Sequence, residues 1–401
     1  MKILVLNCGS SSIKYKLFEM ESKEVIAQGG IEKIGMKGSF LKATLPNGDK
    51  LMLEGEVLEH RAGIEYILGV LLSEEHGCIK SLEEIEAVGH RVVHGGEYFN
   101  ESVLIDDEVI KSLIDCIELA PLHNPPNLKG IYAIQELMPT TPQVAVFDTA
   151  FHQTMPDHAY MYGIPYSLYE KYGIRRYGFH GTSHRYVSKR VCEFLGVPFE
   201  EQRIITAHIG NGGSVTAIKN GESIDTSMGM TPVEGLIMGT RSGDVDPGVV
   251  SFIMEKEHMG TQGISTLLNK FSGVLGVSGI SSDMREIEDG YFSGNERAVL
   301  AMDMYNYRIK KFVGSYTAAL GGLDILVFTG GVGENQALTR EYVCRNMEYM
   351  GIELDEELNN SVRAKEIVIS KPTSKVKVLI IPTDEELTIA QDTLEILKAK
   401  N

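Results

Sequence analysis

The sequence lacks the features that would place it in several other protein classes. Its 401 residues contain five cysteines, an odd number with no Cys-x-x-Cys pair. A disulfide framework or a zinc site is therefore not indicated, and a reducing, cytoplasmic location is expected. No apolar run approaches the roughly 18 residues that cross a membrane, and no signal peptide is recognised. These absences predict a cytoplasmic protein without a membrane partner.

Positive charge is also in short supply. The chain has 38 lysines and arginines against 55 acidic residues, a net charge of −17. This balance argues against nucleic acid or an anionic membrane as a partner, so an anionic substrate must meet a local basic cluster. The length of the chain and its 43% of hydrophobic residues predict a globular protein of two domains.

Common nucleotide-binding and metal-binding motifs are absent as well. The chain has no G-x-x-x-x-G-K-[ST], no H-R-D or D-F-G, and no complete G-x-G-x-x-G that opens a helix. The pairs His90/His94 and His180/His184 have a spacing that binds zinc only on a helix. The first pair lies in a strand pattern and the second straddles a turn, so zinc is not expected.

The first hairpin is the most informative stretch that is present. An apolar run at Ile3–Leu6 predicts a buried strand, and a second strand resumes at Ile13–Leu17. The turn between them, Asn7–Ser12, is built from small hydroxyls and Gly9. Its N–H groups and hydroxyls suit a phosphate, with Lys14 supplying positive charge. An ordinary Gly/Ser hairpin turn is the competing interpretation of this stretch.

Strand and helix patterns alternate along the chain, which predicts α/β architecture with helices packed on the sheet. Strands are expected at 85–96, 143–147 and 376–381, and helices at 60–75, 126–138 and up to 195. Asp106 is expected to cap a further helix that ends before Pro121. A capping box of Thr383 and Glu386 is expected to open a terminal helix. Asp148 follows a strand, where ligands of such sheets gather.

The hairpin recurs later in the chain. Residues 203–218 are again strand, glycine-rich turn and strand, and His208 aligns with Asn7. A looser likeness joins 88–96 to 326–331. We expect a duplicated domain with a cleft between the copies, although two Gly-rich hairpins can also match by chance. The expected domains are 1–150, joined by the terminal helix 386–401, and 151–385.

The glycine turns, with local lysine and arginines, indicate a small phosphate-bearing ligand. Magnesium prefers oxygen ligands and phosphates. Asn7, Asp148 and Glu385 could supply those oxygens; for Glu385 a plain carboxylate at a helix N-terminus is the alternative.

The ordered motifs of the whole chain resemble those of the acetate kinase family. They are found at Val5–Lys14, His90–Gly96, Phe147–His152, Arg176–His184, Ala207–Val215, Gly239–Pro247, Gly330–Asn335 and Pro382–Glu386. The resemblance implies a duplicated actin-like (ribonuclease H-like) fold of the actin/hexokinase/Hsp70 superfamily, with an interdomain active-site cleft. It also implies a homodimer that transfers the γ-phosphoryl group of ATP to acetate by direct in-line transfer, reversibly giving acetyl phosphate and ADP, with magnesium or manganese.

The resemblance also assigns roles to residues of this sequence. Asp148, His180 and Arg241 are the implied catalytic residues, and Asn7 and Glu385 the implied metal ligands. The acceptor site would comprise Arg91, which holds the carboxylate, and Val93, Leu122, Phe179 and Pro232, which enclose the methyl group. ATP would be held by Ser10, Ser12, Lys14, His208, Ile209, Gly210, Asn211, Gly212, Asp283, Met284, Arg285, Gly331, Val332, Gly333, Glu334 and Asn335.

Some alternatives stay open on the sequence. A propionate or butyrate kinase is the nearest rival, and an ATP-switched chaperone or filament protein of the same fold is a remote one. Because a carboxylate acceptor is already anionic, no strong general base is needed. Asp148 is therefore more naturally a metal positioner than a base.

Overall fold

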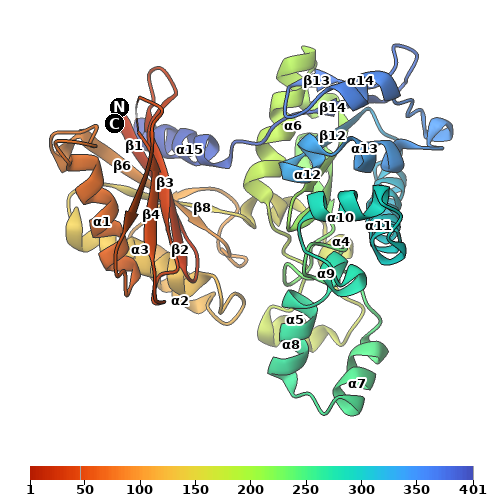
Figure 1. Ribbon diagram of the computed structural model, residues 1–401, viewed down its shortest axis with the longest axis horizontal. Coiled ribbons are helices and arrows are strands. Elements are labelled where there is room, and N and C mark those ends of the chain that lie inside the picture. The colour runs from red at the N-terminus through yellow and green to blue at the C-terminus, as the bar shows by residue number, and fades with distance from the viewer. Residues whose placement is uncertain (46, 401) are drawn as a thin grey trace. The chain divides into compact units, whose positions relative to one another are not determined.

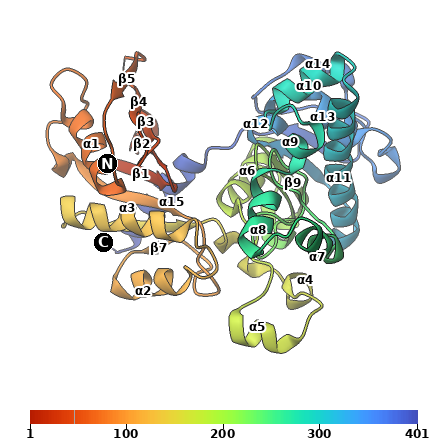
Figure 2. The ribbon, with the colours of Figure 1, turned by 60° about the horizontal axis from the view of Figure 1, so that its bottom comes forward.

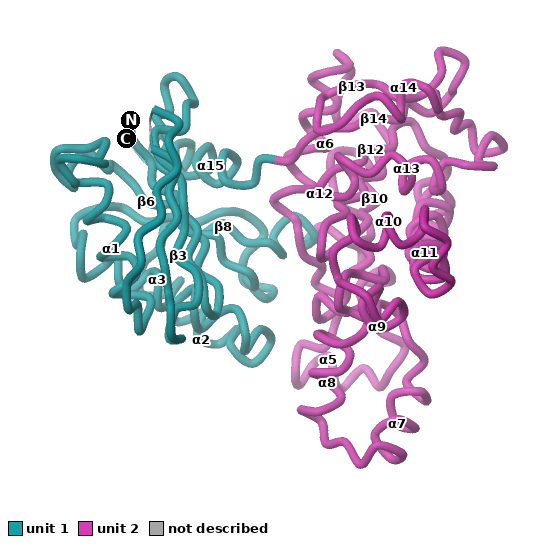
Figure 3. The backbone as a smooth tube through the Cα atoms, viewed as in Figure 1, with its two compact units in different colours: residues 1–153, 384–401 teal, residues 154–383 magenta. Residues whose placement is uncertain are grey.

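The structure, a computed structural model, describes residues 1–45 and 47–400, which form two compact units. The first contains residues 1–153 and 384–401, and the second contains residues 154–383 (Figure 3). Within these described ranges, no helix combines the length and the apolar character needed to cross a membrane.

The first unit is built on a sheet with the strand order β5-β4-β3-β2-β1-β6-β8-β7 (Figure 1). β1 pairs antiparallel with β2 and parallel with β6, which is in turn parallel to β8. The strands are β1 (Lys2–Cys8), β2 (Ser12–Glu19), β3 (Glu24–Glu32), β4 (Phe40–Thr44), β5 (Lys50–Glu54), β6 (Ile85–Val92), β7 (Val103–Leu104) and β8 (Gln143–Phe147).

Helices cover both faces of this sheet because β1 is apolar on both sides. Leu4 and Leu6 pack in a core with α1 (His60–Leu72) and α3 (Asn124–Leu137). Ile3 and Val5 point to the other face and pack against α15 (Glu385–Lys400). A continuous apolar run is typical of a strand buried on both faces. α2 (Asp107–Asp115) packs near α3.

The second unit has a sheet of the order β11-β10-β9-β12-β14-β13. Its strands are β9 (Arg203–Ile209), β10 (Gly213–Lys219), β11 (Glu222–Thr226), β12 (Ile325–Thr329), β13 (Ile367–Val368) and β14 (Lys377–Ile380). The long helix α11 (Glu296–Leu320) contacts α9, α10 and α13, which gather around it in Figure 2.

The other helices of this unit are α4 (Asp157–Tyr160), α5 (Tyr166–Tyr172), α6 (Gly181–Leu195), α7 (Pro247–Lys256), α8 (Thr261–Lys270), α9 (Gly273–Ser278), α10 (Met284–Phe292), α12 (Gly330–Asn335), α13 (Ala337–Cys344) and α14 (Glu356–Ser361). Short 3-10 helices occur at Leu82–Glu84, Ala150–Thr154, Phe199–Glu201 and Glu348–Met350.

The two sheets follow one plan. β9 pairs antiparallel with β10 and parallel with β12, and β12 is parallel to β14, as β1 pairs with β2 and β6 and β6 with β8. Each sheet also ends in a two-residue antiparallel strand, β7 on β8 and β13 on β14. The predicted α/β duplication is therefore confirmed, and both matches noted in the sequence fall on equivalent strands.

Most local predictions agree with the structure, and one is wrong. The strand 143–147 is β8, and Asp106 caps α2 by accepting the N–H of Val109 at 2.9 Å. The capping box of Thr383 and Glu386 does not form. The Asp384 carboxylate accepts the N–H of Leu387 at 3.1 Å, while the Thr383 hydroxyl lies 2.8 Å from that of Ser183. The cap passes to Asp384 because the threonine is engaged within the second unit.

Candidate active site

Three predicted site residues of the first unit meet at the ends of adjacent parallel strands. Asn7 lies near the end of β1, Arg91 is the next-to-last residue of β6, and Asp148 directly follows β8. Parallel neighbours deliver their carboxyl ends to the same sheet edge, which brings these side chains together.

Arg91 and Asp148 form a two-pronged ion pair. Nε and Nη2 of Arg91 donate to the two carboxylate oxygens of Asp148 at 3.0 and 2.6 Å, and Nη1 donates to Oδ1 of Asn7 at 3.4 Å. The Asp148 carboxylate raises the pKa of Arg91. The side chain of Asp148 is almost fully buried, whereas that of Arg91 keeps a quarter of its surface exposed. The guanidinium can therefore still meet a ligand.

Glu385 adds a second carboxylate to this group from the first turn of α15. Burial and the negative charge of Asp148 raise its pKa to about 7, against the opposing effect of Arg91. The carboxylates of Asp148 and Glu385 repel each other. Together with the amide oxygen of Asn7 they form an oxygen donor set that fits magnesium. A divalent cation would relieve the repulsion between them.

The turn of the first hairpin is held by local bonds. The N–H of Gly9 donates to the carbonyl of Ser12 at 2.8 Å, and Nε2 of His60 lies 2.6 Å from the carbonyl oxygen of Gly9. Ser10 is exposed and Ser12 half-buried. No sequence pattern pointed to His60, because its contact joins the start of a helix to a turn about 50 residues earlier.

In the second unit, His180 and Arg241 converge on the turn between β9 and β10. A Cβ atom placed on Gly212 would lie 3.2 Å from Nη1 of Arg241 and 3.8 Å from Nε2 of His180. Because Gly212 has no side chain, the backbone of the turn stays accessible beside the Arg241 guanidinium and the His180 ring. The motifs that predicted these three residues lie far apart in the sequence, and the fold joins them at one turn.

Arg241 is a half-buried cation without a carboxylate partner in the part of the chain that the structure describes. Its Nη1 donates to the carbonyl of Pro232 at 3.3 Å, and burial lowers its pKa. A guanidinium in this condition gains most from an anionic ligand, since nothing else nearby neutralises it.

His180 is fixed by two other histidines and by Ser214, and of these only Ser214 was not singled out in the sequence. It has a left-handed backbone (φ 55°) at the start of α6, and its ring stacks on that of His208 at 4.3 Å. Nδ1 of His180 lies 2.9 Å from Oγ of Ser214, which also lies 2.7 Å from Nε2 of His184. The spacing of His180 and His184 therefore brings both rings to Ser214 rather than to a zinc ion.

A cavity of about 750 Å³ brings together most of the remaining predicted ATP contacts. Its lining includes Gly210, Asn211, Asp283, Met284, Arg285, Gly331, Val332 and Asn335, all of which were predicted. Ser282, Glu288 and Gln336 also line it and were missed. Gln336 follows α12 and donates to the carbonyl of Met284 at 3.2 Å, so it ties two walls of the cavity.

Other predicted ATP contacts lie outside this lining. Ile209 is fully buried, and Gly333 is buried within α12. One carboxylate oxygen of Glu334 accepts the N–H groups of Gly330 and Thr383 at 2.9 and 3.1 Å, so this side chain braces the loop. Lys14 is exposed on β2 and lines a different cavity.

The residues predicted to enclose a methyl group are divided between the two units. In the first unit Val93 is buried and Leu122 is 66% exposed. In the second, Phe179 is buried and Pro232 is half-buried. The N–H of Val93 donates to Oδ1 of Asn127 at 3.1 Å, which fixes the backbone beside Arg91.

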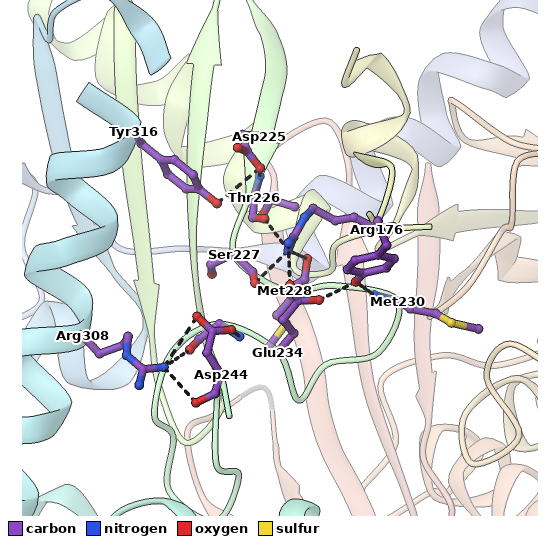
Figure 4. Close-up of polar contacts among 12 residues, drawn as sticks. Arg176, Asp225, Thr226, Ser227, Met228, Met230, Glu234, Asp244, Arg308 and Tyr316 are labelled. Atoms are coloured by element: carbon purple, nitrogen blue, oxygen red, sulfur yellow. Dashed lines mark hydrogen bonds and ion pairs between the residues drawn. The ribbon is translucent and has the colours of Figure 1, made fainter. Parts of the chain in front are cut away.

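Arg176 holds the loop that carries Pro232 and Arg241 (Figure 4). Its Nη1 donates to the carbonyl oxygens of Thr226, Ser227 and Met228 at 3.0 to 3.1 Å. Its Nη2 donates to Glu234 at 2.5 Å.

Three further contacts complete this arrangement. The other carboxylate oxygen of Glu234 accepts the hydroxyl of Tyr162. Farther along the loop, Arg308 donates to the carbonyl of Gly235 at 2.9 Å and pairs with Asp244 at 3.6 Å. The loop is therefore anchored on both sides of Pro232.

Comparisons with known proteins agree across the full chain. The model of the Acetokinase family matches residues 2–391. Acetate kinases of Azobacteroides pseudotrichonymphae and Bacteroides thetaiotaomicron are 70% and 69% identical, each over 99% of this chain and 100% of the relative. The crystal structure of Porphyromonas gingivalis acetate kinase matches with 65% identity and a TM-score of 0.96, covering 99% of both chains. A propionate kinase from Francisella tularensis matches with 43% identity and a TM-score of 0.91, covering 98% of this chain and 99% of that one.

Proposed function

This chain belongs to the acetokinase family, and on that premise we propose that it transfers the γ-phosphoryl group of ATP to acetate, reversibly giving acetyl phosphate and ADP. The resemblance read from the ordered motifs is confirmed by the family match over residues 2–391. The chain is thus a kinase whose acceptor is a carboxyl group, and the residue roles that follow are our assignments.

The unpaired guanidinium of Arg241 beside His180 is the observation that best supports the assignment. Phosphoryl transfer is accelerated by positioning and by neutralising charge on the equatorial oxygens of the transferred group. Both side chains border the open backbone of the turn at Gly212. We assign Arg241 and His180 to the stabilisation of the phosphoryl group in flight, by direct in-line transfer.

Arg91 is assigned to the acetate carboxylate. Nε and Nη2 of Arg91 donate to Asp148. Nη1 makes only a long hydrogen bond of 3.4 Å to Asn7, so it can donate to a bound acetate. A planar fork matches a carboxylate better than a point charge does. Because acetate is already anionic, Asp148 is not needed as a base.

Magnesium, or manganese in its place, would be held by Asn7 and Glu385 with support from Asp148. When bound, the ion would neutralise phosphate charge. Within the protein, Asp148 also orients Arg91 through its two hydrogen bonds, so one carboxylate serves the acceptor and the metal ligands together.

The cavity of the second unit is assigned to ATP. Its volume of about 750 Å³ suits a nucleotide-sized ligand. Asp283–Arg285 and Gly331–Asn335 would lie on the adenosine side, and the turn 208–212 would lead the phosphates toward Arg241. Lys14, Ser10 and Ser12 of the first hairpin are assigned to the phosphates as well.

Acetate is the proposed acceptor over propionate. Val93, Leu122, Phe179 and Pro232 are assigned to its methyl group, and a single extra methylene changes discrimination by only about 1–3 kcal/mol. Weak use of propionate is therefore expected. The propionate kinase from Francisella tularensis, 43% identical, keeps that activity as the second candidate. A cytoplasmic homodimer completes the proposal.

Trapping the acyl phosphate tests this function directly. The protein is incubated with ATP, magnesium and acetate in the presence of hydroxylamine, and the hydroxamate is measured. We expect hydroxamate only when acetate and ATP are both present. ATP hydrolysis without hydroxamate from any short carboxylate would overturn the proposal. Higher kcat/KM for propionate than for acetate would favour the second candidate.

A further inference from the structure

A basic surface lies on the first unit, and the proposed reaction accounts for only one of its lysines, Lys14. Four lysines, Lys14 and Lys16 on β2, Lys42 on β4 and Lys50 on β5, line one cavity of about 750 Å³. They fall on alternate positions of their strands, and alternate residues share a face. The intervening residues Tyr15, Ala43 and Leu51 pack into the core on the other face.

Strand register sets how these lysines are spaced. Lys14 pairs with Gly30, which pairs with Lys42. Neighbouring strands are about 4.8 Å apart, so the backbones at Lys14 and Lys42 lie about 10 Å apart across Gly30. On the row beside them, Lys50 pairs with Thr44. The lysines therefore border a shallow floor rather than stacking on one another.

The floor is kept low by glycine. A Cβ atom on Gly30 would lie 2.6 Å from the carbonyl oxygen of Ile13, too close for any side chain without a backbone shift. Glycine at this position thus leaves open the space between Lys14 and Lys42. Both rows of lysines line the same cavity.

Most of this positive charge is not neutralised within the unit. Lys16 pairs with Glu386 at 3.2 Å and with Asp384 at 3.7 Å. Among the described residues, Lys14, Lys42 and Lys50 form no ion pair. Glu32 and Glu386 also line the cavity; Glu386 is paired with Lys16, so Glu32 is the acidic group left to oppose an anion there. In a chain with a net charge of −17, three lysines on one floor without an acidic partner among the described residues are a local exception; Nζ of Lys42 lies 4.9 Å from the centroid of the Phe40 ring.

We propose that this lysine face, defined as Lys14, Lys42 and Lys50 around Gly30, binds a linear polyphosphate. A chain of phosphates carries several charges along a line and can reach successive lysines, whereas a single carboxylate meets only one. Ammonium groups bind phosphates as point charges and tolerate varied geometry. The occupant is either free polyphosphate or the phosphate chain of a nucleotide, which share this chemistry.

The proposal does not depend on the proposed function. The ATP cavity lies in the second unit and shares no lining residue with the lysine face. Lys14 is also assigned to ATP phosphates, so the test leaves it unchanged and alters Lys42 and Lys50, which have no assigned role in catalysis.

Titration calorimetry with inorganic triphosphate tests the site in the full chain at low salt. We expect Lys42→Ala/Lys50→Ala to weaken triphosphate binding at least tenfold. The matched control Lys37→Ala/Lys111→Ala removes the same charge from exposed positions outside the cavity, and we expect its affinity to stay within twofold of the wild type. Glu32→Gln should bind more tightly. The kcat and the KM for ATP should be unchanged in Lys42→Ala/Lys50→Ala.

A parallel titration with ATP identifies the source of the phosphate chain. Two ATP sites in the wild type and one in Lys42→Ala/Lys50→Ala would support a nucleotide occupant. One ATP site in both, with triphosphate binding lost only in the variant, would support free polyphosphate. Equal loss in the control variant, or unchanged triphosphate binding in Lys42→Ala/Lys50→Ala, would overturn the proposal. An inactive protein that still binds triphosphate in this pattern would sink the proposed function alone.

Discussion

Arg91 and Arg241 show how one residue type serves two purposes in different surroundings. Arg91 is held by a nearly buried carboxylate and keeps its charge firmly. Arg241 is half-buried with only a carbonyl and a thioether as partners in the described chain, and burial lowers its pKa. The ion pair with Asp148 orients the guanidinium of Arg91 for a ligand. The guanidinium of Arg241 keeps a positive charge that a phosphoryl group can neutralise.

We expect Arg241→Ala to lower kcat by about 10³-fold or more, by analogy with arginine fingers. Arg241→Lys should recover little, because the planar fork is lost. Hydroxamate assays at saturating ATP and acetate measure the effect. Arg190→Ala, which removes the ion pair between Arg190 of α6 and Glu366, is the control. A loss of tenfold or less in Arg241→Ala would contradict the assigned role.

Asn7 carries a prediction about the metal. Asn7→Ala should weaken the apparent magnesium affinity more than the affinity for acetate, because its amide oxygen is assigned to the ion or its waters. Initial rates measured across magnesium and acetate concentrations separate the two constants. A larger change in the acetate constant would return the turn to a purely structural role.

Val93 carries a prediction about the acceptor. Val93→Ala should narrow the gap in kcat/KM between acetate and propionate, since a smaller side chain leaves room for a methylene. The expected change is within the roughly 1–3 kcal/mol that one methylene supplies. An unchanged ratio of the two substrates would count against a contact between Val93 and the methyl group.

At the scale of elements, the loop after β11 depends on Arg176. One guanidinium spans three successive carbonyl groups and the carboxylate of Glu234, which lysine cannot reproduce. We expect Arg176→Lys to lower kcat by about 10- to 100-fold, because small displacements of a catalytic group are costly. The KM for ATP should change less than threefold, since the loop contributes nothing to the lining of the ATP cavity.

A matched control exists for this prediction. Arg203, at the start of β9, donates to both oxygens of Asp324 and to the carbonyl of Gly321. Arg203→Lys makes the same chemical change at a similar network away from the loop. Comparable losses of kcat in both variants would show a general effect on the unit rather than positioning of Arg241.

The buried strand β6 predicts a pH dependence of stability. His90 is 2% exposed, its Nε2 lies 2.8 Å from Oε1 of Gln143, and burial lowers its pKa to about 4. In the unfolded chain this pKa is about 6.5. Between these two pKa values His90 is protonated in the unfolded state but neutral in the folded state. The free energy of unfolding therefore decreases as the pH falls from about 6.5 toward 4.

The size of this effect can be measured by urea unfolding. Between pH 7.5 and 5, His90 should account for a loss of about 2 kcal/mol in the free energy of unfolding. His90→Gln carries no titrating group, so its stability should fall by that much less over the same range. Identical pH slopes for the two proteins would contradict the assignment.

At the scale of the whole molecule, the features predicted from the sequence are those that depend on contiguous stretches of residues. The first hairpin, its copy at β9–β10 and the strand before Asp148 are contiguous patterns, and they led to the fold and to most of the ATP cavity. The grip of Arg176 on the carbonyls of Thr226–Met228 has no local pattern, since backbone acceptors about 50 residues away carry no residue signal.

The same reason explains the other omissions. Gln336 becomes a cavity wall only because it reaches the carbonyl of Met284, and Thr383 loses its cap because it meets Ser183. Such contacts depend on tertiary packing, which overrides local signals at helix ends and turns.

The position of α15 has a consequence for the order in which the chain can fold. Ile389 and Ala390 of this helix cover Ile3 and Val5 of the first strand, so the first unit closes its core with residues that are made after the second unit. The second unit, 154–383, is one continuous stretch. During synthesis the middle of the chain can therefore complete its core while the opening sheet still exposes one apolar face. The nascent chain would carry that exposed face until α15 has been made, and it is there that we expect chaperones to engage it.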